Sequence, residues 1–352
     1  MLLLTKTPLV SVHMITYNHD PYIVQAIEGV LQQKTNFPIE LIIGEDCSTD
    51  RTREIVLEYQ RKNPALIRIL LSDNNVGAHK NSRRVSAVCR GKYIAYCEGD
   101  DYWIDPLKLQ KQVDLLEANP DYGMVHGYCF IYNEKSMTFY PSGHEKKDIN
   151  LLQGSIFEAE LIDNCIYTCS ACIRKDLIEK YFDEDELLEQ RFQMGDYPLW
   201  LEISRHSKVG YITDPLGVYR ETNNSASCRN HIVKRKKFIK SCYDVKHYYT
   251  KKYNVSDEIV RKISVMKAKS DLLFAFQLNN RIEATNIFEN LLQYQDIKLD
   301  RDSYINYFGS RNYINRFIVK LFRRFFYLKK LIKFKVIDKS LSKRIEKICG
   351  SA

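Results

Sequence analysis

The chain has 352 residues, which is enough for one large domain with an accessory region, and its 45% hydrophobic and 28% charged residues are ordinary for a globular protein. No stretch approaches about 18 consecutive apolar residues, and Met1 to Lys6 hold too few apolar residues for a signal peptide, so neither a spanning helix nor secretion is expected. We therefore expect a cytoplasmic protein whose ten cysteines are free thiols.

The net charge of +9 comes from the C-terminus. Residues 311–352 carry 13 lysines and arginines against two acidic residues, whereas the rest of the chain is slightly acidic. Apolar residues such as Phe317, Leu321 and Phe325 interleave with these basic residues, as in an amphipathic helix. Such a helix suits an anionic membrane surface on the cytoplasmic face of the inner membrane. The alternative is a helix whose aromatic face packs on the protein. Because no nucleic-acid-binding motif accompanies the charge, no nucleic acid partner is expected.

Residues 1 to 130 alternate between the periodicities of strands and helices. Strands are predicted at 9–15, 39–44, 66–71 and 93–97, and helices at 21–33, at 78–89 and from the N-cap residues 48–50 to Tyr59. This order predicts an α/β fold with a mostly parallel, doubly wound sheet, in which ligands bind beyond the carboxyl ends of the strands. No glycine-rich phosphate loop follows the first strand, so a dinucleotide-binding domain is not expected.

The segments after Pro106 are expected to be a helix to about residue 118 and strands at 122–132, 166–173 and 209–219. Residues 141–150 are polar and are expected to form a loop over the site. Cys169 and Cys172 form a Cys-x-x-Cys motif within the strand-like run 166–173, whereas redox motifs open helices, so a metal or redox role is disfavoured. From His231 onward the pattern is helical and increasingly basic.

Three polar clusters follow predicted strands and should converge at one edge of the sheet: Thr16-Tyr17-Asn18, Glu45-Asp46 and Glu98-Gly99-Asp100-Asp101. The adjacent aspartates provide the hard oxygen ligands that Mg²⁺ or Mn²⁺ prefers, since these ions take one or two protein carboxylates plus substrate phosphates. A metal held there would neutralise charge on a diphosphate leaving group. The alternative is a solvated acidic turn that caps the next helix.

Four ordered blocks within Val10 to Gln112 resemble the inverting glycosyltransferases of family 2, which have the GT-A fold. The blocks read VSVHMITYN from Val10, IIGEDCSTD from Ile42, NNVG from Asn74 and GKYIAYCEGDDYW from Gly91. The resemblance implies a hexosyltransferase of the type that builds bacterial cell-surface polysaccharides. Its donor would be a nucleoside diphosphate sugar, with a UDP-sugar favoured, and its acceptor a glycan or lipid-linked glycan.

The resemblance also implies roles for single residues. Tyr17 would stack on the nucleotide base and Asp46 would hydrogen-bond it, while Asp100 would reach the ribose or diphosphate and Asp101 would ligate the metal. Each could instead be structural, for example Tyr17 by packing and Asp46 by capping a helix. Glu98 departs from the family's D-x-D-D pattern, and Ser82-Arg83 stands where the family often has Arg-Asn. The donor-site candidates are Thr16, Tyr17, Asn18, Asp46, Lys80, Arg83, Glu98 and Asp100, and the metal candidates are Asp101 and Asp100.

An inverting transfer needs a general base that takes the proton of the acceptor hydroxyl. The family places this base at the start of a helix, as Glu-Asp before an aromatic residue and Leu-Trp. Here the segment from Gly195 to Trp200 reads GDYPLW, so Asp196 matches the base and glycine replaces the preceding glutamate. The alternative is that Asp196 only caps the helix. Thr222 stands where relatives often have a metal-binding histidine after Tyr219-Arg220, so water would complete the metal shell.

The resemblance implies a catalytic domain over residues 1–230, with a nucleotide-binding half at 1–105 and an acceptor-side half at 106–230, followed by a helical region at 231–352. Two other functions stay open. A sugar-phosphate nucleotidyltransferase should carry a glycine-rich basic loop after the first strand, which residues 16–22 lack. A membrane-associated scaffold with a transferase-like fold would keep the sheet without catalysis.

Overall fold

The computed structural model describes residues 7–222, 231–292 and 301–311. The basic tail from residue 312 onward lies outside the described residues. The chain divides into two compact units, of which the first ends at Glu221 and the second begins at Thr222.

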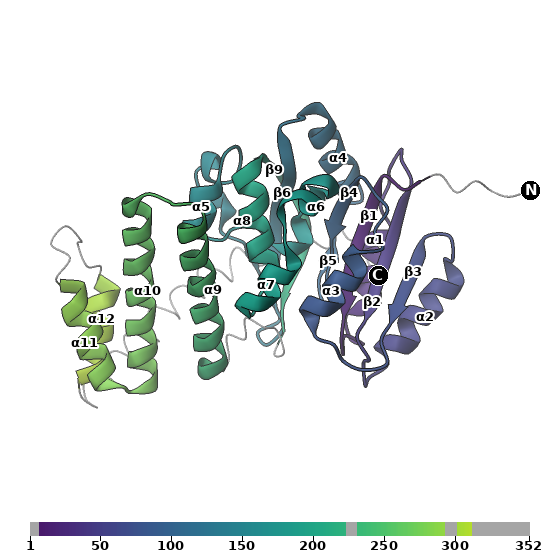
Figure 1. Ribbon diagram of the computed structural model, residues 1–352. Helices are drawn as coiled ribbons and strands as arrows, with labels where there is room; N and C mark the ends of the chain where they lie inside the picture. The colour runs from purple at the N-terminus through teal and green to yellow at the C-terminus, as the bar shows by residue number, and fades with distance from the viewer. Residues whose placement is uncertain (1–6, 223–230, 293–300, 312–352) are drawn as a thin grey trace, which may run out of the picture. The chain divides into compact units, whose positions relative to one another are not determined.

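The first half of the first unit is a parallel sheet whose strands are linked by helices (Figure 1). Its strands are β1 (Val10–Thr16), β2 (Ile39–Glu45), β3 (Ile67–Leu71) and β4 (Tyr93–Tyr96), in the order β3-β2-β1-β4. The linking helices are α1 (Ile23–Leu31), α2 (Thr52–Lys62) and α3 (Ala78–Ser86). All of the strands and helices predicted here are present, and the carboxyl ends of β1, β2 and β4 lie at one edge of the sheet.

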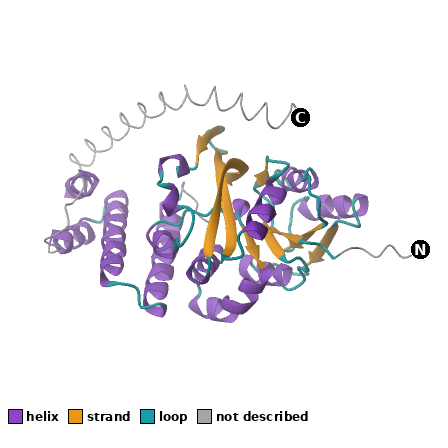
Figure 2. Cartoon of the chain, turned by 90° about the horizontal axis from the view of Figure 1, so that it is seen from above, coloured by secondary structure: helices purple, strands orange, loops and turns teal. Residues whose placement is uncertain are grey.

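The sheet continues beyond β4 with mixed pairing in the order β4-β8-β6-β9-β5, and helices lie on either side of its strands (Figure 2). Its strands are β5 (Tyr102–Trp103), β6 (Tyr122–Asn133), β7 (Thr138–Pro141), β8 (Cys172–Arg174) and β9 (Lys208–Glu221). Its helices are α4 (Lys108–Ala118), α5 (Phe157–Ile162), α6 (Lys175–Tyr181), α7 (Glu184–Gln190) and α8 (Asp196–His206). Only β6 and β9 are parallel in this half. Residues 97–101 connect β4 to β5, and β5 pairs antiparallel with β9.

One prediction for this half is wrong. Residues 166–173 do not form one strand, because residues 168–170 coil into the 3-10 turn η3 (Thr168–Ser170) before β8 begins. The turn is fixed by the buried Trp103, whose indole N–H donates to Cys169 O at 2.8 Å. Residues 142–150 form a loop that includes the 3-10 turn η1 (His144–Lys146) and most of η2 (Ile149–Leu151), and Pro141 ends β7. His144 is buried, with its Nε2 2.7 Å from Cys165 O.

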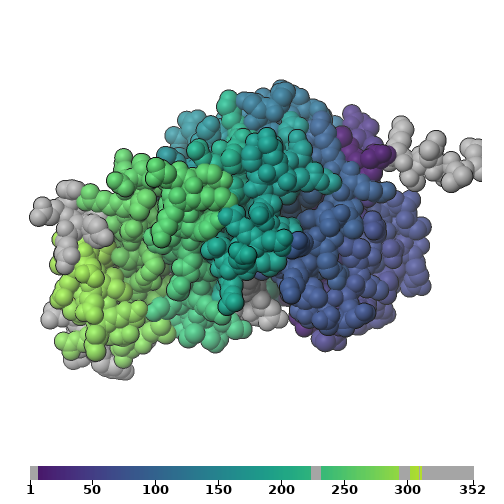
Figure 3. Space-filling view, in the orientation of Figure 1, coloured from purple at the N-terminus to yellow at the C-terminus, as the bar shows by residue number. Residues whose placement is uncertain are grey.

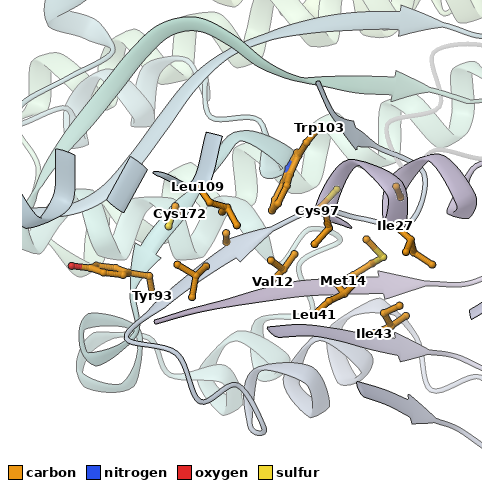
Figure 4. Close-up of a cluster of buried hydrophobic side chains, with 14 of the residues drawn as sticks. Val12, Met14, Ile27, Leu41, Ile43, Tyr93, Cys97, Trp103, Leu109 and Cys172 are labelled. Atoms are coloured by element: carbon orange, nitrogen blue, oxygen red, sulfur yellow. The ribbon is translucent and has the colours of Figure 1, made fainter. Parts of the chain in front are cut away.

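A hydrophobic core joins the strands to the helices above them (Figure 4). Val12, Met14, Leu41 and Ile43 come from β1 and β2, and all four side chains are fully buried. The same cluster includes Trp103, beside the loop that connects β4 to β5. Burial of these large side chains, each contributing on the order of 2 kcal/mol, fixes the strand ends from which the polar clusters project.

The second unit is helical in its described part, as the sequence pattern predicts. It contains α9 (Ile232–Lys252), α10 (Asp257–Leu278), α11 (Arg281–Leu292) and α12 (Arg301–Arg311). Leu272, Ala275 and Phe288 belong to its buried cluster, and Tyr307 stacks on Phe288 with ring centroids 4.0 Å apart. Over the described ranges of the chain, none of the helices has the length and apolarity needed to cross a bilayer.

Candidate active site

The acidic loop, residues 98–101, packs directly on the residues that follow β1. Gly99 N donates to Ile15 O at 3.0 Å. A Cβ atom added at Gly99 would lie 2.6 Å from Thr16 Oγ1 and 2.8 Å from His19 Nδ1, so a side chain at this position would force the two loops apart. The structure thus brings together the clusters that follow the first and fourth strands.

Two hydrogen bonds from β9 hold the acidic loop. Asp101 is only 1% exposed, and its Oδ1 accepts from the backbone N–H of Arg220 at 2.8 Å. The Arg220 Nε donates to the backbone O of Asp100 at 2.7 Å, and its guanidinium lies 4.9 Å and 5.1 Å from the ring centroids of Tyr22 and Tyr102. The second oxygen of Asp101, Oδ2, is buried and finds no hydrogen-bond partner among the described residues.

Asp100 is the more accessible aspartate. Its side chain is 19% exposed, and its Oδ2 lies 3.9 Å from His19 Nε2. The other ring nitrogen of His19, Nδ1, is buried without a hydrogen-bond partner in the described part of the chain. The sequence interpretation missed His19. The signal that could have found it is an imidazole directly after Tyr17-Asn18 at the carboxyl end of a strand.

Four carboxyl groups, those of Glu98, Asp100, Asp101 and Asp196, act on one another electrostatically. Burial, and then the charges of neighbouring carboxylates, hold the pKa values of Glu98 and Asp101 well above the ordinary range. The negative charge of Asp100 acts on both groups, and that of Asp196 also acts on Glu98. The charge of Asp196, from a distant part of the sequence, therefore reaches the acidic loop, and a cation would neutralise part of this negative charge.

Asp196 is the first residue of α8, and its carboxylate is held from two sides. Its Oδ2 accepts from Thr168 Oγ1 at 2.7 Å, and its Oδ1 accepts from the backbone N–H of Tyr197 at 2.7 Å. A Cβ atom added at Gly195 would lie 2.9 Å from His79 Nδ1 on α3. A side chain at this position would require the His79 ring to shift.

The loop after β1 is tied to the loop after β2. Asn18 adopts a left-handed backbone with φ 54°, which asparagine tolerates better than most residues. Its Oδ1 accepts from Thr49 N at 2.8 Å, and its backbone N–H donates to Ser48 Oγ at 3.0 Å. Tyr17, one residue earlier, is 41% exposed. The loop thus presents Tyr17 while Asn18 fixes the backbone.

Asp46 is 2% exposed, and backbone amides occupy both of its oxygens. Val76 N donates to Oδ1 at 2.8 Å and Gly77 N to Oδ2 at 2.9 Å. Gly77, with φ 85°, turns the chain into α3. Asp46 therefore holds the loop before α3. It does not cap α2, where Thr52 N donates to Asp50 Oδ1 at 2.9 Å.

The two basic candidates on α3 differ in their surroundings. Arg83 binds α7, with its Nε 3.3 Å from Glu184 Oε2 and its Nη1 2.5 Å from Asp185 Oδ1. The surfaces of α3 and α7 lie side by side (Figure 3). Lys80 is exposed on the same helix. The structure therefore places Arg83 in a contact between two helices, whereas Lys80 stays open to solvent.

A buried carboxyl group on α5 predicts a pH-dependent stability. Burial raises the pKa of Glu160 to about 7 from an ordinary value of 4.5, while Cys165 N donates to its Oε2 at 3.0 Å. The folded state therefore binds the proton more tightly than the unfolded state does. Stability is full below pH 4.5 and falls as the pH rises to about 7, by up to about 3 kcal/mol.

This prediction compares the wild type with Glu160→Gln, which keeps the acceptor for Cys165 and cannot ionise. Urea unfolding followed by tryptophan fluorescence reports the first unit, because Trp103 and Trp200 are the only tryptophans of the sequence. Between pH 4.5 and pH 7 the stability of the wild type should fall relative to the variant. Parallel pH profiles of the two proteins would contradict the prediction.

The chain is similar to known glycosyltransferases. Residues 11–182 match the family model described as "Glycosyl transferase family 2". An uncharacterized protein of Mycobacterium tuberculosis is 39% identical over 212 residues, which are 60% of this chain and 58% of that relative. The match thus spans little more than half of the relative's length.

Two solved structures share the fold at low sequence identity. The mannosyltransferase PcManGT from Pyrobaculum calidifontis, in complex with GDP-Man and Mn²⁺, has a TM-score of 0.55 and 15% identity, covering 90% of this chain and 84% of that chain. Residues 1–349 of S. aureus TarS, in complex with UDP-GlcNAc, have a TM-score of 0.52 and 17% identity, covering 85% and 79%. At these identities the likeness bears on the fold alone.

Proposed function

The chain belongs to glycosyl transferase family 2 and has the GT-A fold, and from this premise we propose that it is an inverting glycosyltransferase. It moves a hexose from a nucleoside diphosphate sugar to a hydroxyl group of a glycan or lipid-linked glycan. The observation that supports the proposal is that the charge of Asp196 acts on Glu98 of the acidic loop while Thr168 Oγ1 holds the Asp196 carboxylate at 2.7 Å. A base and a metal-binding pair of aspartates in one site suit the transfer of a sugar from a diphosphate.

The acidic loop fits a divalent cation such as Mn²⁺ or Mg²⁺. The unpaired Oδ2 of Asp101 and the accessible carboxylate of Asp100 are hard oxygen ligands. Over the described residues, no group of three or more His, Cys, Asp or Glu side chains could hold an ion unaided, so the donor diphosphate and water would complete the shell. Because Asp100 is the more accessible carboxylate, we rank it as the first metal ligand, whereas the sequence resemblance favours Asp101 in that role. The cation would supply neutralisation of charge on the leaving diphosphate.

The donor nucleotide would bind over the loop that follows β1. Tyr17 offers an exposed ring on which the base can stack. Thr16, Asn18 and Asp46 shape the surrounding loops, and because amides occupy both Asp46 oxygens, we assign it to holding the pocket wall. A UDP-sugar is the donor class we propose, and TarS, of the same fold, binds UDP-GlcNAc. Lys80 is free to reach the diphosphate, and Arg83 is left out of the donor site.

Asp196 acts as the general base. Thr168 orients its carboxylate, which removes the proton of the acceptor hydroxyl as that oxygen attacks the anomeric carbon. The new bond joins the acceptor oxygen to the anomeric carbon, and the bond from that carbon to the diphosphate oxygen breaks on the opposite face. The configuration is therefore inverted, the proton ends on Asp196, and the nucleoside diphosphate leaves with the electron pair.

Family membership favours a glycosyltransferase over a sugar-phosphate nucleotidyltransferase. Measurable sugar transfer would exclude the non-catalytic scaffold.

We also propose that the basic tail docks the protein on the anionic cytoplasmic face of the inner membrane. This proposal rests on the composition of residues 311–352 alone.

The proposed donor class is tested by thermal unfolding of the full chain with a panel of UDP- and GDP-sugars, with Mn²⁺ or with EDTA. A UDP-sugar at about 100 times its Kd should stabilise the protein by about 2.7 kcal/mol. This shift should need Mn²⁺ and be lost in Asp100→Asn. Equal stabilisation in EDTA would contradict the metal-dependent site, and stabilisation by GDP-sugars alone would contradict the donor class.

A further inference from the structure

Two tyrosines are each adjacent in sequence to a residue that holds part of the proposed site. Tyr167 directly precedes Thr168, which donates to Asp196, and Tyr219 directly precedes Arg220, which holds the acidic loop. The two rings contact each other, with centroids 5.5 Å apart and planes inclined by 50°. Both side chains are partly exposed. This tyrosine pair, Tyr167 and Tyr219, is used by none of the steps described above.

Strand pairing places Tyr219 on the side of the sheet that faces the turn η3, which directly follows Tyr167. Trp103 lies opposite Gly217 in the β5–β9 ladder, and because side chains alternate along a strand, Tyr219 shares the face of Gly217. Trp103 on this face donates to Cys169 O in the turn that carries Thr168. The ring contact between the two tyrosines agrees with this placement.

Contacts with Ser142 and His144 hold the ring of Tyr167 in place. Its hydroxyl donates to Ser142 O at 3.3 Å, and the ring of His144 lies on it with centroids 5.7 Å apart. His144 is itself fixed, because its Nε2 lies 2.7 Å from Cys165 O and its Nδ1 3.2 Å from the hydroxyl of Tyr211. An aromatic surface that is ordered in advance loses little conformational entropy when a ligand stacks on it.

The chemistry of the pair selects its ligand. The faces of the two rings are apolar, their hydroxyl edges are polar, and a pyranose ring has the matching combination of C–H faces and hydroxyl edges. A diphosphate would instead be drawn to a metal on the acidic loop. Thr168, the residue after Tyr167, donates to Asp196, so a ligand bound on the pair would lie close to the carboxylate that must reach the acceptor hydroxyl.

We propose that the tyrosine pair is an acceptor subsite that stacks on the terminal pyranose ring of a glycan and so presents one of its hydroxyl groups to Asp196. This inference rests on the proposed function and adds the class of acceptor. The acceptor is an existing sugar chain, so the enzyme extends a glycan and does not attach the first sugar to a lipid phosphate or a simple alcohol. An earlier glycosyl transfer must therefore supply its substrate.

The test uses the full chain with its best UDP-sugar and Mn²⁺, and a panel of p-nitrophenyl pyranosides as acceptors, with n-octanol as the acceptor without a sugar ring. Tyr167→Ala and Tyr219→Ala should each raise the KM of the pyranoside about tenfold, the equivalent of about 1.4 kcal/mol, while the donor KM changes less than about twofold. The matched Tyr167→Phe and Tyr219→Phe variants keep the ring and should stay near the wild type in both constants.

Tyr128→Ala is the packing control. Tyr128 also contacts His144, with ring centroids 6.3 Å apart, but it is not adjacent in sequence to Thr168 or Arg220. Its acceptor KM should stay near that of the wild type. The subsite would be overturned if Tyr128→Ala raised the KM of the pyranoside as much as the tyrosine-pair variants do. It would also be overturned if those variants raised the donor KM, or if the enzyme preferred n-octanol to the pyranosides as its acceptor. A wild-type chain that turns over no nucleotide sugar would overturn the proposed function itself, which is a separate result.

Discussion

Asp196→Asn should lower kcat for sugar transfer about 10³-fold, the largest effect we expect from a single substitution. Asparagine keeps the size of the side chain and an oxygen that accepts from Thr168 or Tyr197 N, so the start of α8 is preserved. It cannot take a proton from the acceptor hydroxyl. Transfer is measured with saturating donor and acceptor, so the loss should be seen in kcat with little change in the donor KM.

Thr168→Val is the matched variant for this prediction. It removes the hydroxyl that orients Asp196 but leaves the carboxylate in place, and it should lower kcat about tenfold. If Asp196 only capped the helix, Asp196→Asn would change stability and leave kcat within a few-fold of the wild type. That result would remove Asp196 from the mechanism.

Asp100→Asn should lower kcat/KM for the donor at least about 100-fold, a loss of about 2.7 kcal/mol of transition-state stabilisation. Its carboxylate is the accessible one in the acidic loop, and an amide oxygen is a weaker ligand for a hard cation. The Mn²⁺ concentration needed for half-maximal activity should also rise. Asp101→Asn should act in the same direction, although its Oδ1 can still accept from Arg220 N.

The control for both aspartates is Asp121→Asn. Asp121 carries an exposed carboxylate that pairs with Lys208 at 2.8 Å, away from the acidic loop. Its loss should leave the metal requirement unchanged, since an exposed ion pair contributes little. A metal requirement that is the same in Asp100→Asn, Asp101→Asn and the wild type would place the cation elsewhere.

The parallel half of the sheet could be predicted from sequence because its signals are local. Each of β1 to β4 is an apolar run, and each connecting helix has apolar residues at helical spacing. The order of these elements then fixes which strand ends meet, so the convergence of Thr16 with Glu98-Gly99-Asp100-Asp101 follows from topology. The four sequence blocks in the same stretch also identified the family that the chain resembles.

The second half depends on contacts between distant residues. The run 166–173 is apolar because it is buried, and its turn at Thr168 is fixed by Trp103, which no local pattern reveals. The bonds of Asp46 to the loop before α3 and of Arg83 to α7 are likewise tertiary. The same holds for Arg220, whose guanidinium is surrounded by aromatic rings from three strands or loops. Sequence therefore located the acidic loop but not the residues that hold it.

The most direct test of the account is release of nucleoside diphosphate from a UDP-sugar by the wild-type full chain, followed with an acceptor glycoside present and compared between Mn²⁺ and EDTA. We predict release that requires Mn²⁺, falls about 10³-fold in Asp196→Asn, and gives a product of inverted anomeric configuration. Release that continues undiminished in EDTA and in Asp196→Asn, or a product that retains the donor's configuration, would contradict the account.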